Sequence, residues 1–483
     1  MPLNDNEISL IVEKVLSELR TPESKHQAQL TITRSAEPQY DRGAFASLDQ
    51  AVETASRAQR ELLGLGMAKR FEIIRRMRET ATHSAELWAQ MAQEETGLGR
   101  VQDKYQKNLL CARKTPGPAD LKNDSTSGDN GLTIVEPAPF GVVGVITPST
   151  NPAATVINNA ISIVSAGNAC VFNPHPSAKH VCAAAAIALY DAVVQSGGPA
   201  NLITVIAQPT HESALAMMQH RGIDLLLVTG GMPVVRLAMT SGKRAICAGP
   251  GNPPVVVDET AVFPKAAKDI VTGASFDNNI LCTDEKEIFV VDKVADLLKR
   301  EMSANGAYEI HGTEIDRVVK LLIEEDKHGK GHRHVRINKK YVGKDLDVIL
   351  NEAGVRGSAK AKLGFMEVEW DHPLVMTEQL LPIIPLVRCR TFEEAMERAV
   401  VAEHGYRHTF VMHSTNISNL SAMAQRCSGN IFVKNGPNMA GLGFGGEGYT
   451  TMSIAGTSGE GLTKASTFTR PRRCTLVDYF RIV

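Results

Sequence analysis

The chain has 483 residues, of which 43% are hydrophobic and 22% charged, as in an ordinary globular protein of two or three domains. A net charge of −1 excludes a global field that would draw the protein to nucleic acid or to an anionic membrane. Eight cysteines without a CxxC pair or Cys/His ligand spacing argue against a metal site and a disulfide scaffold, and they fit a reducing cytosol. No apolar run looks long enough to span a membrane.

The N-terminus predicts an amphipathic helix over residues 1–19, followed by a polar, Pro- and Ser-containing linker over residues 20–42. It lacks the basic start and the uninterrupted apolar core of a secretory signal. A helix this short is marginal without a partner surface. We interpret it as a docking peptide rather than as a helix packed on its own domain. The apolar positions that recur at helical spacing are Ile8, Ile11, Val12, Val15, Leu16 and Leu19.

Residues 43–250 predict a nucleotide-binding domain. Ser47 and Gln50 form a capping box for a helix to about residue 64, a second amphipathic helix covers residues 68–95, and residues 132–150 are rich in strand formers. Helices and short apolar strands then alternate, which is typical of a doubly wound parallel sheet. The expected helices span residues 154–167, 177–196, 211–220 and 232–241, and the expected strands span residues 169–173, 202–207, 223–229 and 244–248.

Residues 251–440 predict a second α/β domain that carries the catalytic residues, and residues 441–461 return to the nucleotide domain. Residues 462–483 have β character and are expected to join residues 120–137 in a small oligomerisation element. The run "GLGFGG" (441–446) matches the GxGxxG pattern of dinucleotide-binding loops, but no strand precedes it and no helix follows it. We interpret it as a glycine loop rather than as a phosphate-binding loop.

Three stretches in register resemble the aldehyde dehydrogenase superfamily: "ITPSTNPAATVINNA" (146–160), "LLLVTGGMPVV" (225–235) and "FDNNILC" (276–282). The resemblance covers about residues 43–483. With "GNPPVVVDETA" and "FVKNGP", it is closer to the CoA-acylating branch tied to bacterial microcompartments, which includes propionaldehyde and acetaldehyde dehydrogenases. It implies a nucleotide domain, a catalytic domain, a small β element and a homo-oligomer, either a dimer or a tetramer.

The resemblance places the catalytic nucleophile at Cys282 and the amide that stabilises the oxyanion at Asn151. A thiolate that attacks an aldehyde creates an alkoxide, which needs hydrogen-bond donors already in place. The alternatives are an inert thiol at Cys282 and an ordinary helix cap at Asn151. The cofactor-binding positions implied by the resemblance are Thr147, Pro148, Ser149, Asn173, His175, Pro176, Thr229, Gly230, Gly231 and Glu378.

Two departures from the hydrolytic members refine this expectation. Their glutamate that activates water corresponds to Ala248, in "CAGPGNPP" (247–254), which favours a thiol such as CoA as the acyl acceptor. The Lys and Glu with which hydrolytic members hold the adenosine ribose correspond to Asn173 and Pro176. The choice of NAD over NADP therefore rests on the resemblance alone. Asp284 and Glu285 follow the nucleophile closely, and such acids should raise its pKa.

The expected function is therefore the oxidation of a short aliphatic aldehyde, propanal or acetaldehyde, with NAD and CoA to acyl-CoA and NADH. The alternatives are a hydrolytic aldehyde dehydrogenase and a non-catalytic microcompartment scaffold. His404 or His408 is a candidate base for the CoA thiol, although a structural histidine is the commoner case. Residues 1–19 would bind a shell or core protein and place the enzyme, otherwise cytoplasmic, in the microcompartment lumen.

Overall fold

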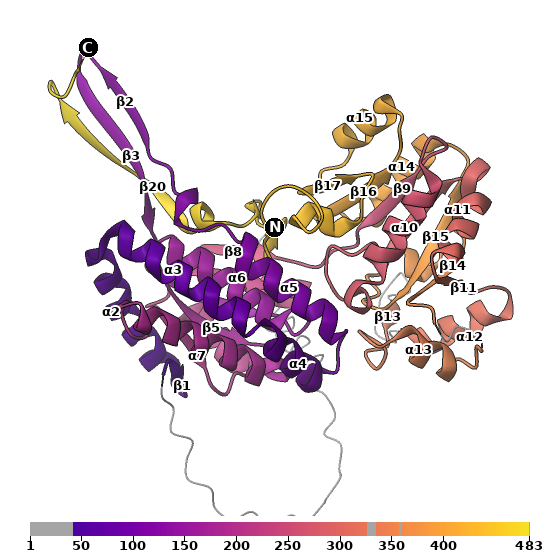
Figure 1. Cartoon of the computed structure of the whole chain (residues 1–483), viewed down its shortest axis with the longest axis horizontal. Coiled ribbons are helices and arrows are strands. Elements are labelled where there is room, and N and C mark those ends of the chain that lie inside the picture. Colours follow the sequence, from indigo (N-terminus) through magenta and orange to yellow (C-terminus); the bar gives the residue numbers. More distant parts are fainter. Residues whose placement is uncertain (1–41, 326–334, 357–359, 483) are drawn as a thin grey trace, which may run out of the picture. The chain divides into compact units, whose positions relative to one another are not determined.

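The computed structural model describes residues 42–325, 335–356 and 360–482 (Figure 1). The predicted docking helix (1–19) and the linker up to residue 41 lie outside the described residues. Two parallel sheets and one small antiparallel sheet organise the rest of the chain, and this mixed α/β architecture confirms the predicted fold class.

The first sheet is parallel and has six strands in the order β1-β6-β5-β4-β7-β8. After the short edge strand β1, the chain forms β4 in the interior of the sheet, adds β5 and β6 on the side of β1, and then crosses to add β7 and β8 on the other side. The connection therefore reverses between β4 and β7, which is where open α/β sheets bind their ligands. The strands are β1 (Ala44–Phe45), β4 (Val142–Thr147), β5 (Ala169–Pro174), β6 (Ile203–Ile206), β7 (Leu225–Thr229) and β8 (Ala245–Ala248).

Eight helices accompany this sheet among the described residues. The Ser47 hydroxyl caps the first of them by accepting from the Gln50 N–H at 3.4 Å. The continuous helix expected over residues 68–95 is wrong, because the chain leaves helical geometry at Ser84 and forms two helices. The eight are α2 (Leu48–Gly64), α3 (Gly66–His83), α4 (Ala85–Thr96), α5 (Val101–Lys114), α6 (Pro152–Ser165), α7 (Lys179–Gln195), α8 (His211–Gln219) and α9 (Met232–Met239).

The segment Pro176–Gln195, which contains α7, is apolar and long enough to cross a membrane by length and composition, contrary to the sequence expectation. It is the one such segment in the described part of the chain. Its apolar face, including Val181, Leu189 and Val193, is buried, and α7 packs against α3, α6 and β6. Burial inside the nucleotide domain accounts for its composition.

The second sheet is also parallel and has seven strands in the order β11-β14-β15-β10-β9-β16-β17. Its central strand β10 follows directly after the segment that carries Cys282. The strands are β9 (Pro254–Val257), β10 (Glu287–Val291), β11 (Ala307–Glu309), β14 (Leu363–Glu367), β15 (Ile383–Cys389), β16 (Thr409–His413) and β17 (Ile431–Lys434). Its helices are α10 (Phe263–Ala274), α11 (Asp292–Ala304), α12 (Thr313–Leu322), α13 (Leu346–Glu352), α14 (Phe392–Ala402) and α15 (Ile417–Arg426).

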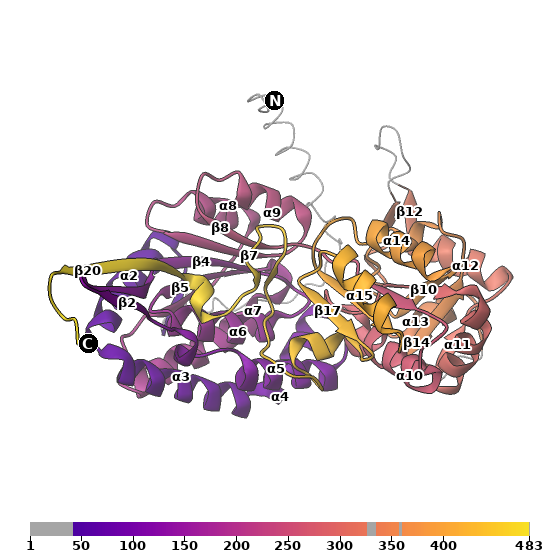
Figure 2. The same ribbon diagram turned by 90° about the horizontal axis from the view of Figure 1, so that it is seen from above.

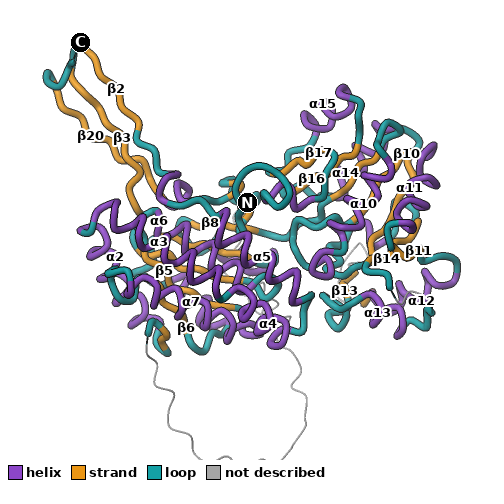
Figure 3. The backbone as a smooth tube through the Cα atoms, viewed as in Figure 1, coloured by secondary structure: helices purple, strands orange, loops and turns teal. Residues whose placement is uncertain are grey.

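The third sheet joins segments that are far apart in the sequence. The C-terminal strand β20 (Thr469–Val477) pairs antiparallel with β3 (Gly131–Pro139), which also pairs with β2 (Asp124–Gly128) (Figures 2 and 3). The side chains of β20 are exposed along almost its whole length. Two short hairpins complete the structure: β12 (Ile323–Glu325) with β13 (Val335–Ile337), and β18 (Ile454–Ala455) with β19 (Gly461–Leu462).

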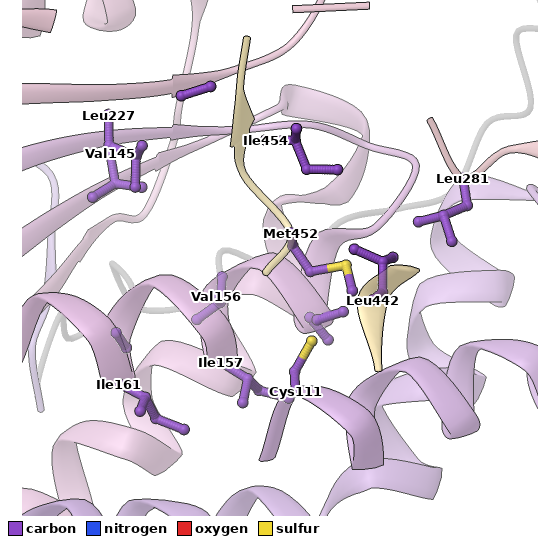
Figure 4. Close-up of a cluster of buried hydrophobic side chains, with 14 of the residues drawn as sticks. Cys111, Val145, Val156, Ile157, Ile161, Leu227, Leu281, Leu442, Met452 and Ile454 are labelled. Carbon is purple, nitrogen blue, oxygen red and sulfur yellow. The ribbon is translucent and has the colours of Figure 1, made fainter. Parts of the chain in front are cut away.

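The main apolar core extends from the six-stranded sheet to the neighbourhood of the predicted nucleophile. Figure 4 shows part of this core, in which Val145 and Leu227 of the sheet and Ile157 of α6 belong to the same cluster as Leu281. Because Leu281 is buried there, the backbone next to Cys282 is held by packing.

Candidate active site

The switch point of the six-stranded sheet gathers most of the predicted cofactor-binding positions. Ile146 pairs with Val228, so Thr147 and Thr229 leave the sheet side by side at its carboxyl edge. Pro148 and Ser149 follow Thr147, and Gly230 and Gly231 follow Thr229. A Cβ on Gly231 would meet only Pro233, at 3.6 Å, so the backbone of this turn is open to a close ligand. This edge fits a dinucleotide.

The adenosine side of this edge differs from the hydrolytic pattern. The Asn173 side chain is buried, and its Oδ1 accepts from the Ser213 hydroxyl at 2.6 Å, next to the capping box of α8. His175 is exposed beside Pro176, and its Nδ1 accepts from the Ser177 N–H at 3.2 Å. Of these three positions, the structure leaves His175 and Pro176 open to a ligand, while the Asn173 oxygen is already bonded.

The Glu95 carboxylate occupies the start of α7, the helix that follows β5. Glu95 accepts from the backbone N–H groups of His180 and Val181, both at 2.8 Å, at the N-terminus of α7. Helix N-termini attract anions, including the phosphates of nucleotides. Here the protein supplies the anion itself, so a cofactor phosphate must find its donors elsewhere on the edge.

The predicted nucleophile follows a turn that is left-handed at three successive residues. Asp277, Asn278 and Asn279 have φ angles of 45°, 56° and 64°. Asn and Asp tolerate this region better than other non-glycine residues, yet each such residue still costs about 1 kcal/mol or more. Their side chains offset this cost with hydrogen bonds: Asp277 accepts from the Arg100 N–H at 2.6 Å, and Asn279 donates to the Glu285 carbonyl at 2.9 Å. The two adjacent amides of "FDNNILC" thus shape the turn that presents the thiol.

Burial, together with the Glu378 and Asp284 carboxylates, raises the pKa of the Cys282 thiol to about 12, and the Lys286 ammonium opposes the shift. The predicted effect of Asp284 is confirmed. Glu285 instead accepts from the Asn438 N–H at 2.8 Å. Lys286 is fully buried and donates to the Asn279 carbonyl at 2.7 Å. The thiol is therefore protonated at neutral pH until a base or a bound charge changes its surroundings.

Glu378 and Cys282 meet across a glycine. The Gly251 N–H points to Glu378 Oε1 at 3.5 Å, and a Cβ on Gly251 would lie 2.6 Å from the Cys282 carbonyl oxygen and 3.0 Å from the His408 ring. Any larger residue at this position would push the nucleophile away. Burial raises the pKa of Glu378, and its long contact with Gly251 leaves capacity for other donors, such as ribose hydroxyls. Ala248, at the buried end of β8, offers no base here.

Asn151 begins helix α6, but its side chain makes no capping bond to that helix, so the simple helix-cap alternative is wrong. Its Oδ1 accepts from the ammonium of Lys107, a buried residue of α5, and its Nδ2 lies 3.3 Å from the Thr150 hydroxyl. Lys107 also donates to Asp277 at the start of the left-handed turn.

The two candidate histidines differ in their surroundings. His408 is buried, and burial lowers its pKa to about 3; its Nδ1 bonds the Thr409 hydroxyl at 2.9 Å. It therefore stays neutral and is a weak base. His404 is exposed, lies 2.9 Å from the Met376 carbonyl through Nε2, and lines a cavity of about 1670 Å³ together with Glu378. Of the two, His404 is the one open to a substrate thiol.

A small apolar cavity of about 10 Å³ is lined in part by Leu281, the residue that precedes the predicted nucleophile in the sequence. That is room for about one water-sized group. Phe276 and Phe444 pack against each other here with ring centroids 6.1 Å apart, so the glycine loop at 441–446 contributes to the cavity wall rather than to a phosphate site. The lining residues are Gln106, Lys107, Leu110, Phe276, Leu281, Met439, Leu442, Phe444 and Met452.

Sequence reasoning missed Lys107, Asp277, Gly251 and Lys286. Only Lys107 left a recognisable signal: it lies four residues before Cys111, so both face the same side of an amphipathic helix, and Cys111 is buried. The other three depend on contacts between segments distant in sequence.

A half-buried thiol that follows a left-handed turn, a nearby amide and a dinucleotide-type edge are the features expected of an oxidoreductase that works through a cysteine. The aldehyde dehydrogenase family model matches residues 32–469. The chain is 47% identical to the acetylating acetaldehyde dehydrogenase EutE of Salmonella typhimurium, over the whole of both chains. It therefore belongs to the aldehyde dehydrogenase family, as the sequence predicted.

Solved structures give the same result. A propionaldehyde dehydrogenase from the Clostridium phytofermentans fucose utilisation bacterial microcompartment is 42% identical and matches with a TM-score of 0.88, over 92% of this chain and all of the other. A propionaldehyde dehydrogenase of Rhodopseudomonas palustris, with bound CoA and an acylated cysteine, is 44% identical and matches with a TM-score of 0.86, over 91% of this chain and 99% of the other.

Proposed function

We propose that the protein is a CoA-acylating aldehyde dehydrogenase in which Cys282 carries the acyl group. The oxidation of a short aldehyde with NAD and CoA to acyl-CoA and NADH is the function that its relatives share. The observation that carries the choice of CoA over water is Ala248, because the buried end of β8 holds a methyl group where a hydrolytic enzyme holds its general base.

The residues divide the chemistry between them. The Cys282 sulfur bonds to the aldehyde carbon, and the Asn151 amide and the Cys282 N–H donate to the oxygen that becomes negative. The turn after Thr229 and the Glu378 carboxylate would hold the cofactor, which would supply the acceptor for the hydride that leaves this carbon. The CoA thiol then gives its proton to a base, for which His404 is the exposed candidate, its sulfur bonds to the acyl carbon, and the Cys282 sulfur leaves as the thiolate.

The small cavity beside Leu281 supports an aldehyde of two or three carbons. Its apolar walls offer no partner to a polar substituent, and its free volume accommodates about one methyl-sized group without movement. Longer chains must displace Phe444 or its neighbours.

The test is product identification with acetaldehyde and propanal, with CoA present and omitted. We expect acyl-CoA in stoichiometric amounts with NADH and little free acid without CoA. Cys282→Ala and Cys282→Ser should form no NADH above background. Free acid as the main product would contradict the acylating assignment, and normal NADH formation by Cys282→Ala would contradict the covalent route.

Two further features belong to this proposal. The relatives from microcompartments support a role for residues 1–19 in binding a shell or core protein, and a deletion of residues 1–20 should retain activity and lose packaging.

Exposed apolar side chains at the C-terminal end support a homo-oligomer built on the β2-β3-β20 sheet. They are Leu476, Val477, Tyr479, Phe480 and Ile482. Light scattering of a chain ending at residue 468 should then show a smaller particle.

A further inference from the structure

Two lysines of α5 share one carboxylate deep inside the protein. Lys104 and Lys107 are buried, and both donate to Asp277 Oδ2, Lys104 at 3.1 Å. Their second contacts differ: Lys104 lies 3.4 Å from the Thr150 carbonyl, whereas Lys107 donates to Asn151 Oδ1. Burial and the neighbouring Lys107 charge lower the pKa of Lys104 to about 8. Burying two lysine ammonium groups beside one carboxylate costs folding free energy, so stability alone does not explain why both lysines are there.

The Lys107 contact decides which end of the Asn151 amide accepts a hydrogen bond from the protein and which end is left to donate. An asparagine amide has a carbonyl oxygen and an NH2 group of nearly equal size, and only the NH2 group can donate to an oxyanion. A lysine ammonium has three donors and no acceptor, so it can bond only the oxygen. Lys107 therefore fixes Nδ2 as the donating end: one of its two hydrogens points to the Thr150 hydroxyl at 3.3 Å, and the other can donate to an oxyanion. It also draws electron density toward Oδ1, which makes the Nδ2–H bonds stronger donors.

The same ammonium connects the amide to the nucleophile. Asp277 begins the left-handed turn that leads to Cys282, and its other oxygen accepts from the Arg100 N–H. A Cβ on Gly99 would lie 2.0 Å from Asp277, so this carboxylate is tightly enclosed. Lys107 thus bonds at once to the amide donor and to the turn that presents the thiol, and it lines the small cavity to which Leu281 also contributes.

We propose that Lys107 is a positioning residue that orients and polarises the Asn151 amide for the oxyanion. The inference deepens the proposed function and rests on it, because it assumes that Asn151 donates to the alkoxide. Lys104 supplies a matched control: it lies on the same helix, is equally buried and shares the same carboxylate, but it does not touch the Asn151 side chain.

The experiment compares Lys107→Met, Lys104→Met and Asn151→Ala in the full-length enzyme. We expect kcat to fall about 100-fold in Lys107→Met and in Asn151→Ala, the loss seen when one oxyanion donor is removed, and less than about threefold in Lys104→Met. The KM for propanal should change little in all three variants. The double variant Lys107→Met/Asn151→Ala should be no slower than Asn151→Ala alone, because Lys107 acts through that amide.

Thermal unfolding and the rate of Cys282 alkylation by iodoacetamide identify structural damage. Both lysine variants should lose similar stability, and alkylation, which forms no oxyanion, should stay within about threefold of the parent. Equal kcat losses in the two lysine variants, or additive losses in the double variant, would overturn the proposal. If Asn151→Ala kept full activity, the proposed function of Asn151 would fail instead, which is a different result.

A second pair keeps the test decisive if Lys107→Met does not fold. Lys107→Arg retains a side chain that only donates, whereas Lys107→Gln carries both an oxygen and an NH2 group and can hold the amide either way round. We expect the Arg variant to have at least about tenfold higher kcat than the Gln variant. Equal kcat values for the two would overturn the proposal.

Discussion

The small cavity beside the nucleophile allows a prediction of aldehyde chain length. Phe444 forms one wall and packs on Phe276 at 6.1 Å between ring centroids, so Phe444→Ala opens space where the substrate chain would extend. Each methylene buried in that space contributes about 0.8 kcal/mol, a factor of about four in kcat/KM. Pentanal has two methylenes more than propanal. The ratio of kcat/KM for pentanal over propanal should therefore rise about 15-fold in the variant.

The assay measures initial NADH formation with a series of linear aldehydes from two to six carbons at saturating NAD and CoA. The matched control is Phe432→Ala, which removes an identical ring from β17, where it packs against a different apolar cluster. The control should keep the parental preference. An unchanged pentanal-to-propanal ratio in Phe444→Ala, or an equal rise in the control, would refute the assignment of this cavity to the substrate chain.

Four further predictions concern charge around the nucleophile and in the core. The rate of Cys282 alkylation should rise about tenfold per pH unit from pH 7 to 9, because the thiol pKa of about 12 lies well above that range; a plateau below pH 9 would contradict this. Glu378→Gln removes a negative charge near the thiol and should therefore speed alkylation at pH 8 about tenfold. Ala248→Glu places a carboxylate at the end of β8, so the variant should form free acid in the absence of CoA, which chromatography would detect. If a folded variant that still forms NADH produced no free acid, the role given to this position would be contradicted. Burial raises the pKa of Glu403 to about 7, so the stability that its protonated form contributes is present below pH 4.5 and is lost as the pH rises through about 7. In urea titrations, the difference in unfolding free energy between the parent and Glu403→Gln should therefore fall by about 1.4 kcal/mol per pH unit from pH 5 to 7. A difference that does not change with pH would contradict this expectation.

Local patterns predicted the secondary structure of the nucleotide domain closely. Strands expected at residues 169–173 and 244–248 are observed at Ala169–Pro174 and Ala245–Ala248, because short apolar runs between turns are unambiguous in a buried parallel sheet. The helix expected over residues 68–95 failed at Ser84, where helical periodicity continues across a break that the tertiary packing introduces. The sequence analysis expected no apolar run of membrane-spanning length, and it therefore underestimated the length of Pro176–Gln195. Only the burial of its apolar face distinguishes this segment from a membrane helix.

The sequence by itself predicted the family, which the comparisons confirm, and also the nucleophile Cys282 and an alanine at the position of the water-activating glutamate, because these are identities at positions of a recognisable motif. Tertiary structure alone decided how those identities act. The buried Lys107 lies in a helix far from Asn151 in the sequence, and the Cys282 carbonyl approaches residue 251 closely only because Gly251 has no side chain. Charge and orientation in a site depend on distances through space, and these arise when the two sheets and α5 pack together, so no local pattern encodes them.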